Sequence, residues 1–197
     1  MSLKKVSVEE AATLVRSGGV VVYPTETVYG VGADAYNEAA VKRVYRIKER
    51  PTERPLSVAV GSVEHIEKVA RPREDALEFA REFLPGPVTP LLPRRQRVPE
   101  IVTSGDLIGV RVPDDEKALA LVNSVGPITS TSANMSGEPP ATRPDELGRL
   151  ADRVDGIIDD GVRDGKPSTV VDTTTWEVVR EGAEVESVRD WLSRNVL

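Results

Sequence analysis

The 197-residue chain contains no cysteine and only one histidine, His65. Without cysteine it can form neither a disulfide nor a thiolate metal site, and it has no cysteine nucleophile. It also lacks the run of about 20 apolar residues that a membrane-spanning helix needs, and its N-terminal segment lacks the apolar core of a secretory signal. We therefore expect no membrane association and a cytoplasmic location, and we interpret His65 as a surface residue near the start of a helix.

Positive charge is in deficit as well, because 26 lysines and arginines oppose 32 aspartates and glutamates. A protein that binds nucleic acid over much of its surface is usually basic, whereas this chain carries a formal net charge of −6. Any contact with RNA is therefore expected to come from a local patch. The two candidates are residues 42–54, which carry six cations and two carboxylates, and the cluster of Arg94, Arg95 and Arg97.

Segments with the patterns of strands and helices alternate along the chain. Ser7 and Glu10 form a capping-box pattern at the start of the first helix, and the apolar run Val20–Tyr23 predicts a strand buried on both faces. Helices are expected over 7–18, 37–48, 62–70, 74–84 and 117–123 and after Thr142 and Ser187, and strands over 20–23, 56–60, 88–92, 108–112, 127–130, 157–158 and 169–171 and before Arg180. This order is typical of an α/β fold. With no repeat or linker, one domain over 1–197 is expected.

The densest candidate for a binding site is the segment Tyr23–Gly32, where a predicted strand ends and hydroxyls, a carboxylate, an aromatic ring and glycines follow. Ligands of α/β proteins bind at loops that follow strand ends. The hydroxyls can hold a small polar substrate, and the glycines let a ligand approach the backbone. The alternative interpretation is a hairpin turn with a few polar residues.

A second candidate, Lys48–Pro51, lies where a predicted helix gives way to a loop. Its two cations, Lys48 and Arg50, could hold a triphosphate, the arginine through its planar fork and the lysine as a point charge. The alternative is a solvated helix end, where the macrodipole favours cations.

A third candidate, Ser130–Gly137, is a serine-rich segment that follows a short apolar strand. Its hydroxyls and backbone N–H groups can surround phosphate oxygens. The lysine and the spacing of a Walker A loop are missing, which excludes an ordinary P-loop. The alternative is a serine-rich turn.

Arg111 is a fourth candidate, because it is embedded in the predicted strand 108–112. An arginine in a strand needs an anionic partner, which is either a structural carboxylate or a ligand. Further along the chain, a glycine-rich stretch (160–165) leads into the segment Pro167–Asp172, and Arg180–Gly182 ends the next strand.

The order of these segments resembles the YrdC-like family, in particular its single-domain threonylcarbamoyladenylate synthases. The matching stretches are YPTETVYGVG, KERP, PGPVT, GVRVP, STSANMSG and PSTVVD, and they extend from about Gly18 to Gly182. Several motifs in the same order are far more specific than one glycine pattern. The resemblance implies a twisted mixed α/β sheet flanked by helices, with a large concave cavity lined by positive charge. It also implies one domain without the additional C-terminal domain of longer relatives.

The resemblance also implies an activity and its site residues. Members of the family condense L-threonine, bicarbonate (or CO₂) and ATP to threonylcarbamoyl-AMP and pyrophosphate. Arg111 would then pair with the threonine carboxylate, Lys48 and Arg50 would hold the phosphates and carry catalysis, and Arg180 would close over the nucleotide. The residues expected at L-threonine are Thr27, Arg111, Ser130 and Ser168. The residues expected at ATP are Lys48, Arg50, Ser132, Asn134 and Arg180.

No protein metal site is expected, because Mg²⁺ would be bound chiefly by the ATP phosphates. The expected downstream partner is the complex that transfers the threonylcarbamoyl group to tRNAs reading codons that begin with A, with a possible weak contact to tRNA or double-stranded RNA. Departures from the family pattern occur at Arg54, Pro140 and Glu181. Two alternatives stay open: a non-catalytic RNA-binding module of tRNA or ribosome maturation, and a related enzyme that activates another amine.

Overall fold

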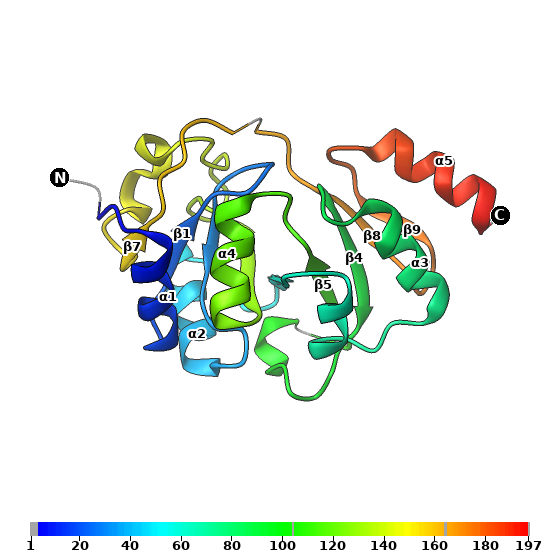
Figure 1. Cartoon of the computed structure of the whole chain (residues 1–197), viewed down its shortest axis with the longest axis horizontal. Coiled ribbons are helices and arrows are strands. Elements are labelled where there is room, and N and C mark those ends of the chain that lie inside the picture. Colours follow the sequence, from blue (N-terminus) through cyan, green and yellow to red (C-terminus); the bar gives the residue numbers. More distant parts are fainter. Residues whose placement is uncertain (1–3, 104, 164, 197) are drawn as a thin grey trace.

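The computed structural model describes residues 4–103, 105–163 and 165–196. Within these ranges nine strands form one twisted sheet in the order β7-β1-β2-β6-β3-β5-β4-β8-β9, with helices on its faces (Figure 1). The pairs β1–β7, β3–β5 and β4–β8 are parallel and the other five pairs are antiparallel. The prediction of a mixed α/β sheet is therefore confirmed. No helix within these ranges is long and apolar enough to cross a membrane.

The elements have the following bounds. The strands are β1 (Val21–Tyr23), β2 (Gly30–Gly32), β3 (Ser57–Ala59), β4 (Val88–Pro93), β5 (Leu107–Arg111), β6 (Ile128–Ser132), β7 (Gly156–Ile157), β8 (Thr169–Asp172) and β9 (Glu177–Arg180). The α-helices are α1 (Val8–Arg16), α2 (Glu38–Lys48), α3 (Glu74–Phe83), α4 (Glu116–Val125) and α5 (Val185–Asn195). Short 3₁₀ helices lie at η1 (Glu64–Lys68), η2 (Glu100–Val102) and η3 (Pro144–Leu150).

Local signals explain where several helices begin. The Ser7 hydroxyl accepts the Glu10 N–H while the Glu10 carboxylate accepts the Ser7 N–H, so the predicted capping box is present. The Asn37 side chain accepts from two backbone N–H groups at the start of α2, as expected. Asp115 caps α4 by accepting the Ala118 N–H at 2.8 Å. These contacts satisfy N–H groups that would otherwise have no partner at a helix start.

Three helix predictions need correction. The segment after Ser62 forms the 3₁₀ helix η1 rather than an α-helix, and the segment after Thr142 forms the 3₁₀ helix η3. The last helix begins at Val185, two residues before the predicted cap at Ser187. Its start is set by tertiary contacts, because the N–H of Ala183 donates to the carbonyl of Pro167 at 2.8 Å and directs the chain into α5.

Strand β2 was not predicted, because two of its three residues are glycines and glycine is uncommon in strands. The structure shows why glycine occupies these positions. A Cβ atom on Gly30 or Gly32 would lie 3.0 Å from the ring of Tyr23, which crosses this strand. The glycines thus let β2 pair with β1 over a buried tyrosine ring.

Apolar side chains pack on the sheet in three clusters. Helices α1 and α4 lie side by side and bury Val15 and Leu121 against β1 and β6 (Figure 1). A larger cluster joins α2 to β2, β3 and β5. At the other end of the sheet, α3 and α5 enclose an aromatic group in which Phe79 lies 5.1 Å from Trp191, centroid to centroid. This third cluster supports β8, which directly follows Ser168, and β9, which ends at Arg180.

Candidate functional site

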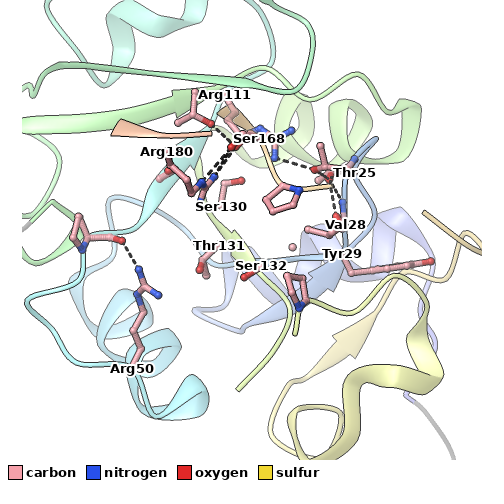
Figure 2. A pocket seen from close by; sticks show the side chains of 17 residues that line it. Thr25, Val28, Tyr29, Arg50, Arg111, Ser130, Thr131, Ser132, Ser168 and Arg180 are labelled. Atoms are coloured by element: carbon pink, nitrogen blue, oxygen red, sulfur yellow. Dashed lines mark hydrogen bonds between the residues drawn. The ribbon is translucent and has the colours of Figure 1, made fainter. Parts of the chain in front are cut away.

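A cavity of about 190 Å³ brings together segments from the whole length of the chain (Figure 2). Its walls come from the β1–β2 connection, the segment after α2, β4, β5, β6, Pro167–Ser168 and β9. The predicted site residues that line it are Thr27, Arg50, Arg111, Ser130, Ser132, Ser168 and Arg180. The sequence motifs therefore meet at one place, although the two remaining predicted residues, Lys48 and Asn134, do not line the cavity.

The connection between β1 and β2 is a tight polar turn that also forms one wall of the cavity. The Thr25 hydroxyl donates to the carbonyl of Val28 at 2.6 Å and accepts the N–H groups of Thr27 and Val28, both at 3.3 Å. Its oxygen also lies 2.9 Å from the Thr27 hydroxyl. A threonine hydroxyl that bonds to the backbone of the following residues stabilises such turns. The segment is therefore a polar turn that lines the cavity, and binding of a ligand by this turn stays a prediction.

Arg111 ends β5 and is 7% exposed. Its Nη1 donates to the Thr27 hydroxyl at 3.3 Å, and its Nη2 forms an ion pair with the carboxylate of Glu26. The side chains of Arg111 and Glu26 are 8% and 17% exposed. The anionic partner predicted for Arg111 is thus a carboxylate of the chain itself, and the guanidinium also faces the cavity.

Ser168 and Arg180 form another part of the lining. The Ser168 hydroxyl lies 2.9 Å from the hydroxyl of Thr89, and Arg180 donates from Nη2 to the Ser168 carbonyl and hydroxyl at 2.8 and 2.9 Å. Burial lowers the pKa of Arg180, and the positive charges of Arg111 and Arg50 lower it further. The close approach of these segments requires glycine at position 182, because a Cβ atom on Gly182 would lie 2.3 Å from the carbonyl oxygen of Pro167.

Arg50 is the third arginine of the cavity. Its Nε donates to the carbonyl of Arg54 at 3.1 Å and its Nη2 to the carbonyl of Pro55 at 2.9 Å. Burial lowers its pKa, and the charge of Arg54 acts in the same direction. Three guanidinium groups therefore converge from residues far apart in the sequence, which suits a ligand with several negative charges.

Lys48 and Asn134 have a different environment from the predicted one. Lys48 is 1% exposed, so the interpretation of a solvated helix end is wrong. Its ammonium donates to the carbonyls of Ser132 and Asn134 and, at 3.2 Å, to the Asn134 side-chain oxygen. Burial lowers the pKa of Lys48 to about 7, with a smaller effect from the charge of Arg50. Together these contacts connect the end of α2 to the serine-rich segment. A direct contact of either residue with ATP stays a prediction.

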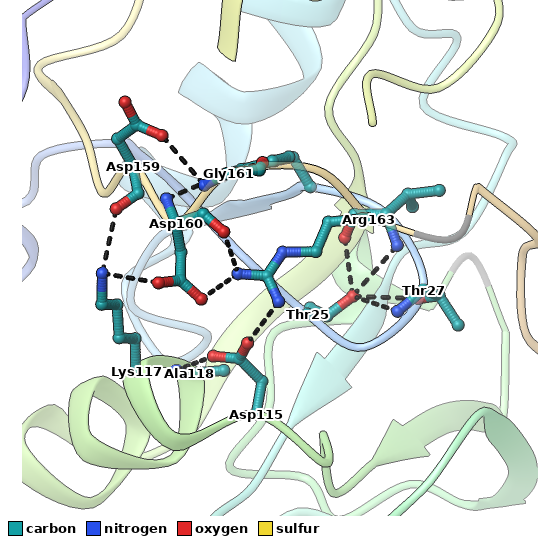
Figure 3. Close-up of polar contacts among 11 residues, drawn as sticks. Thr25, Thr27, Asp115, Lys117, Ala118, Asp159, Asp160, Gly161 and Arg163 are labelled. Carbon is teal, nitrogen blue, oxygen red and sulfur yellow. Dashed lines mark hydrogen bonds and ion pairs between the residues drawn. The ribbon is translucent and has the colours of Figure 1, made fainter. Parts of the chain in front are cut away.

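Figure 3 shows a set of ion pairs that was not predicted from the sequence. These ion pairs fix the segment before Ser168 beside the β1–β2 turn. We call residues 159–163 and 165–167 the strap. Arg163 in the strap pairs with Asp115 at 3.1 Å, and Lys117 pairs with Asp160 at 2.8 Å. The N–H of Gly165 donates to the carbonyl of Thr27 at 2.9 Å. The strap therefore links α4 to the polar turn and continues into Ser168. The glycine-rich composition of this stretch was its only signal in the sequence.

Several cavity residues had no role assigned from the sequence. Thr89 lies in an otherwise apolar strand, a position at which a polar residue is a usable signal. The Tyr29 hydroxyl donates to the carbonyl of Gly161 at 2.8 Å and accepts the N–H of Asp160 at 3.0 Å, so it anchors the strap. Pro140, a departure from the family pattern, lines the cavity. Arg54, another departure, is not among the lining residues, and its backbone carbonyl accepts a hydrogen bond from Arg50.

A second, more apolar depression of about 470 Å³ adjoins the cavity and shares Pro55, Ser57 and Arg180 with it. Its other walls include leucines and valines of the sheet, among them Val179, which is 60% exposed. A polar cavity that continues into an apolar one is suited to a ligand with a charged part and a flat, weakly polar part.

No group of three or more histidine, aspartate or glutamate side chains that could hold a metal ion occurs in the part of the chain that the structure describes. Among the described residues that line the cavity, none is acidic. The donor set of the cavity, arginines and hydroxyls, is suited to phosphate and carboxylate oxygens.

Comparison with known proteins identifies the family. The model of the Sua5/YciO/YrdC domain, described as "Telomere recombination", matches residues 13–182. The chain belongs to this family. It is 42% identical over 174 residues to the threonylcarbamoyl-AMP synthase of Pyrococcus abyssi, covering 86% of this chain and 51% of that protein. It is 39% identical to the threonylcarbamoyl-AMP synthase of Pseudomonas aeruginosa, covering 86% of this chain and 94% of that protein.

Solved structures of the Sua5/YciO/YrdC family share the fold. The crystal structure of P. abyssi Sua5 complexed with L-threonine is 40% identical with a TM-score of 0.87, and the match covers 92% of this chain and 56% of that one. Escherichia coli YciO is 32% identical with a TM-score of 0.82, and the match covers 89% of each chain. The chain thus spans about half the length of the P. abyssi relative and nearly all of the P. aeruginosa relative. These matches confirm the resemblance seen in the motifs. The names of these relatives support the synthase interpretation and do not support the RNA-binding module.

Proposed function

We propose that the chain is an L-threonylcarbamoyladenylate synthase, which condenses L-threonine, bicarbonate or CO₂, and ATP to threonylcarbamoyl-AMP and pyrophosphate. The observation that carries the proposal is the meeting of Arg111, Arg50 and Arg180 in one cavity of a chain that is 40% identical to a relative solved with L-threonine. One site can then hold the carboxylate of an amino acid and the phosphates of a nucleotide together.

The threonine subsite in this proposal is the corner around Arg111. Its guanidinium faces the cavity beside the Thr27 hydroxyl and offers N–H groups to a carboxylate. The hydroxyls of Ser130 and Ser168 lie in the same lining and suit the amine and hydroxyl of threonine. Short polar side chains leave room for a small substrate, which agrees with a cavity of about 190 Å³.

The nucleotide in this proposal lies across the two adjoining depressions. Arg50 and Arg180 bind the phosphates together with the Ser132 hydroxyl, and the apolar depression beside Arg180 receives the adenine. Lys48 and Asn134 support this side by fixing the backbone of the serine-rich segment. Mg²⁺ would arrive with the ATP phosphates and neutralise their charge, because magnesium in nucleotide sites is bound largely by phosphates and water.

The residues of the cavity suit a reaction that depends on alignment. The threonine amine and bicarbonate first form a carbamate, with loss of water. A carbamate oxygen then attacks the α-phosphorus of ATP, and pyrophosphate leaves with the electrons of the broken P–O bond. Holding the two reactants in line and neutralising charge account for most of catalysis in such transfers. The arginines supply both, so the absence of cysteine and the presence of only one histidine are no obstacle.

The remaining parts of the proposal concern the cell rather than the cavity. The domain 1–197 would act in the cytoplasm and supply threonylcarbamoyl-AMP to the complex that modifies adenosine in tRNAs reading codons that begin with A. Because the product is an acyl adenylate, a second enzyme must accept it and transfer the threonylcarbamoyl group. A weak contact with tRNA would bring the product close to this acceptor.

Pyrophosphate release tests the proposal directly. Purified protein receives ATP, Mg²⁺ and bicarbonate, with and without L-threonine, and the products are analysed by mass spectrometry. We expect release that requires both threonine and bicarbonate, together with threonylcarbamoyl-AMP. Replacing threonine by other amino acids tests the alternative of a different amine. Folded protein that releases no pyrophosphate under these conditions would count against the synthase assignment.

A further inference from the structure

The lining of the cavity does not by itself separate a carboxylate from a polyphosphate. Arg50, Arg111 and Arg180 all enter it, and none of the lining residues that the structure describes is acidic. The planar guanidinium fork binds carboxylate and phosphate oxygens in the same bidentate way. A site that must hold both anions at once therefore needs a feature that keeps the phosphates of ATP away from one of the three arginines.

Glu26 sets one arginine apart. Its carboxylate is paired with Nη2 of Arg111, and both side chains are largely buried, at 17% and 8% exposure. The bonds of Arg50 and Arg180, in contrast, run to uncharged oxygens, the carbonyls of residues 54 and 55 and the carbonyl and hydroxyl of residue 168. The charge of Arg111 is therefore compensated by a carboxylate, whereas Arg50 and Arg180 face the cavity bonded to neutral groups.

The surroundings of Arg180 and Arg50 favour an arriving anion. Burial lowers the pKa of Arg180, and the positive charges of Arg111 and Arg50 lower it further. The pKa of Arg50 is lowered in the same way, by burial and by the charge of Arg54. A lowered arginine pKa means that the charged form is disfavoured at that position. An arriving anion compensates for the lost hydration of the guanidinium and for the repulsion between the cations.

Stability alone does not account for the pair. The Nε of Arg111 and the Oε2 of Glu26 are buried, and neither has a partner in the described structure. An unpaired buried polar atom destabilises the folded state, and buried ion pairs are often no more stable than apolar replacements. A buried pair that carries two such atoms, and whose arginine lines the cavity, points to a role in recognition.

We propose that Glu26 is a positioning and specificity-determining residue, which reserves Arg111 for the carboxylate of threonine by excluding the phosphates of ATP from that corner. The inference rests on the proposed function. Threonine is a zwitterion without net charge at neutral pH, so a nearly neutral Arg111–Glu26 pair accepts it at little electrostatic cost. A triphosphate carries several negative charges, which the Glu26 carboxylate repels. The polyphosphate is therefore confined to Arg50 and Arg180, whose hydrogen bonds in the described part of the chain run to carbonyl and hydroxyl oxygens.

Binding measured without turnover tests the inference. Titration calorimetry with L-threonine is performed with and without saturating inorganic tripolyphosphate, for the native protein and three variants. Glu26→Gln keeps a hydrogen-bonding group of the same size but removes the charge. Glu26→Asp keeps the charge. Glu74→Gln is the matched control, since Glu74 is bonded to Arg81 at 2.9 Å in an exposed pair outside the cavity.

For the native protein and for the variants Glu26→Asp and Glu74→Gln, we expect the dissociation constant of threonine to change less than about twofold when tripolyphosphate is added. In Glu26→Gln, tripolyphosphate should bind at least about tenfold more tightly and should weaken threonine binding by a similar factor. This corresponds to about 1.4 kcal/mol, a small figure for the removal of one partly buried charge. In turnover, the KM for threonine of this variant should rise with ATP concentration.

Two results would overturn the inference. One is competition between tripolyphosphate and threonine in the native protein, a measurement that needs no variant to fold. The other is independent binding of the two ligands to folded Glu26→Gln. Native protein that releases pyrophosphate in a threonine-dependent manner, yet shows such competition, would retain the proposed function and lose the role of Glu26. Native protein that binds neither ligand would refute both.

Discussion

The buried ammonium of Lys48 should make the stability of the protein rise with pH above neutrality. The side chain is 1% exposed, and burial lowers its pKa from 10.5 to about 7. In the unfolded chain the same group stays protonated until its ordinary pKa. Between these two values the unfolded state binds more protons than the folded state, so the free energy of unfolding increases with pH. The direction is opposite to that of a lysine stabilised by an ion pair.

The contacts of Lys48 limit the size of this effect. A pKa difference is equivalent to about 1.4 kcal/mol per unit, so about three units between pH 7 and pH 10 give an upper limit near 4 kcal/mol. The three oxygen acceptors around Nζ oppose deprotonation, because a neutral amine can donate to only two of them. Losing one hydrogen bond of a charged group costs about 1.5–3 kcal/mol. We therefore expect a net gain of about 1–2.5 kcal/mol.

Urea unfolding at about pH 7 and about pH 10 measures this gain, with Lys48→Met as the variant that keeps the length of the side chain without its charge. The native protein should gain stability over this range and the variant should change by less than about 0.5 kcal/mol. Burial raises the pKa of Tyr23 and Tyr45 to about 12, an effect that lowers stability only above about pH 10. An equal change in both proteins would show that Lys48 does not cause the pH dependence.

Three further substitutions test separate parts of the structure. Arg111→Ala should lower threonine-dependent pyrophosphate release at least about hundredfold, because it removes the proposed partner of the carboxylate; near-normal turnover with an unchanged threonine requirement would refute that assignment. Gly182→Ala should raise the KM for ATP at least about tenfold, because its Cβ would lie 2.3 Å from the carbonyl oxygen of Pro167 and displace the segment after Arg180; a lower melting temperature with an unchanged KM would contradict this. Ser7→Ala should cost about 1 kcal/mol of unfolding free energy through loss of the capping box, with unchanged turnover; a stability equal to that of the native protein would show that the cap contributes nothing.

Features decided by neighbouring residues could be predicted from the sequence. The capping box at Ser7, the cap at Asn37 and the buried strand β1 depend on residues within a few positions of one another. The start of α5 did not follow from its sequence, because a backbone contact between Ala183 and Pro167 decides it. The strand β2 was not predicted for a related reason, since its glycines are required by contact with the ring of Tyr23, which only the folded structure shows.

The candidate site could be predicted as a set of residues but not as an arrangement. Each motif alone allowed a structural interpretation, and the resemblance to a family joined them. The sequence did not show that Lys48 is turned toward carbonyl oxygens of the serine-rich segment rather than into the cavity. Nor did it show that Glu26 is the anionic partner of Arg111, or that Arg163 reaches Asp115. All three depend on pairs of residues that lie far apart in the chain, and no local pattern records such a pair.

Many polar groups of the cavity already have partners, and this bears on how ligands enter it. Arg180 is bonded to Ser168, Arg50 to backbone carbonyls and Arg111 to Glu26. A phosphate that takes Arg180 must compete with neutral oxygens, which bind a guanidinium less strongly than an anion does. A carboxylate at Arg111 must instead share the guanidinium with another carboxylate. The same fold therefore makes exchange easy at two arginines and selective at the third, so the choice between ligands lies in the partners that each arginine already holds.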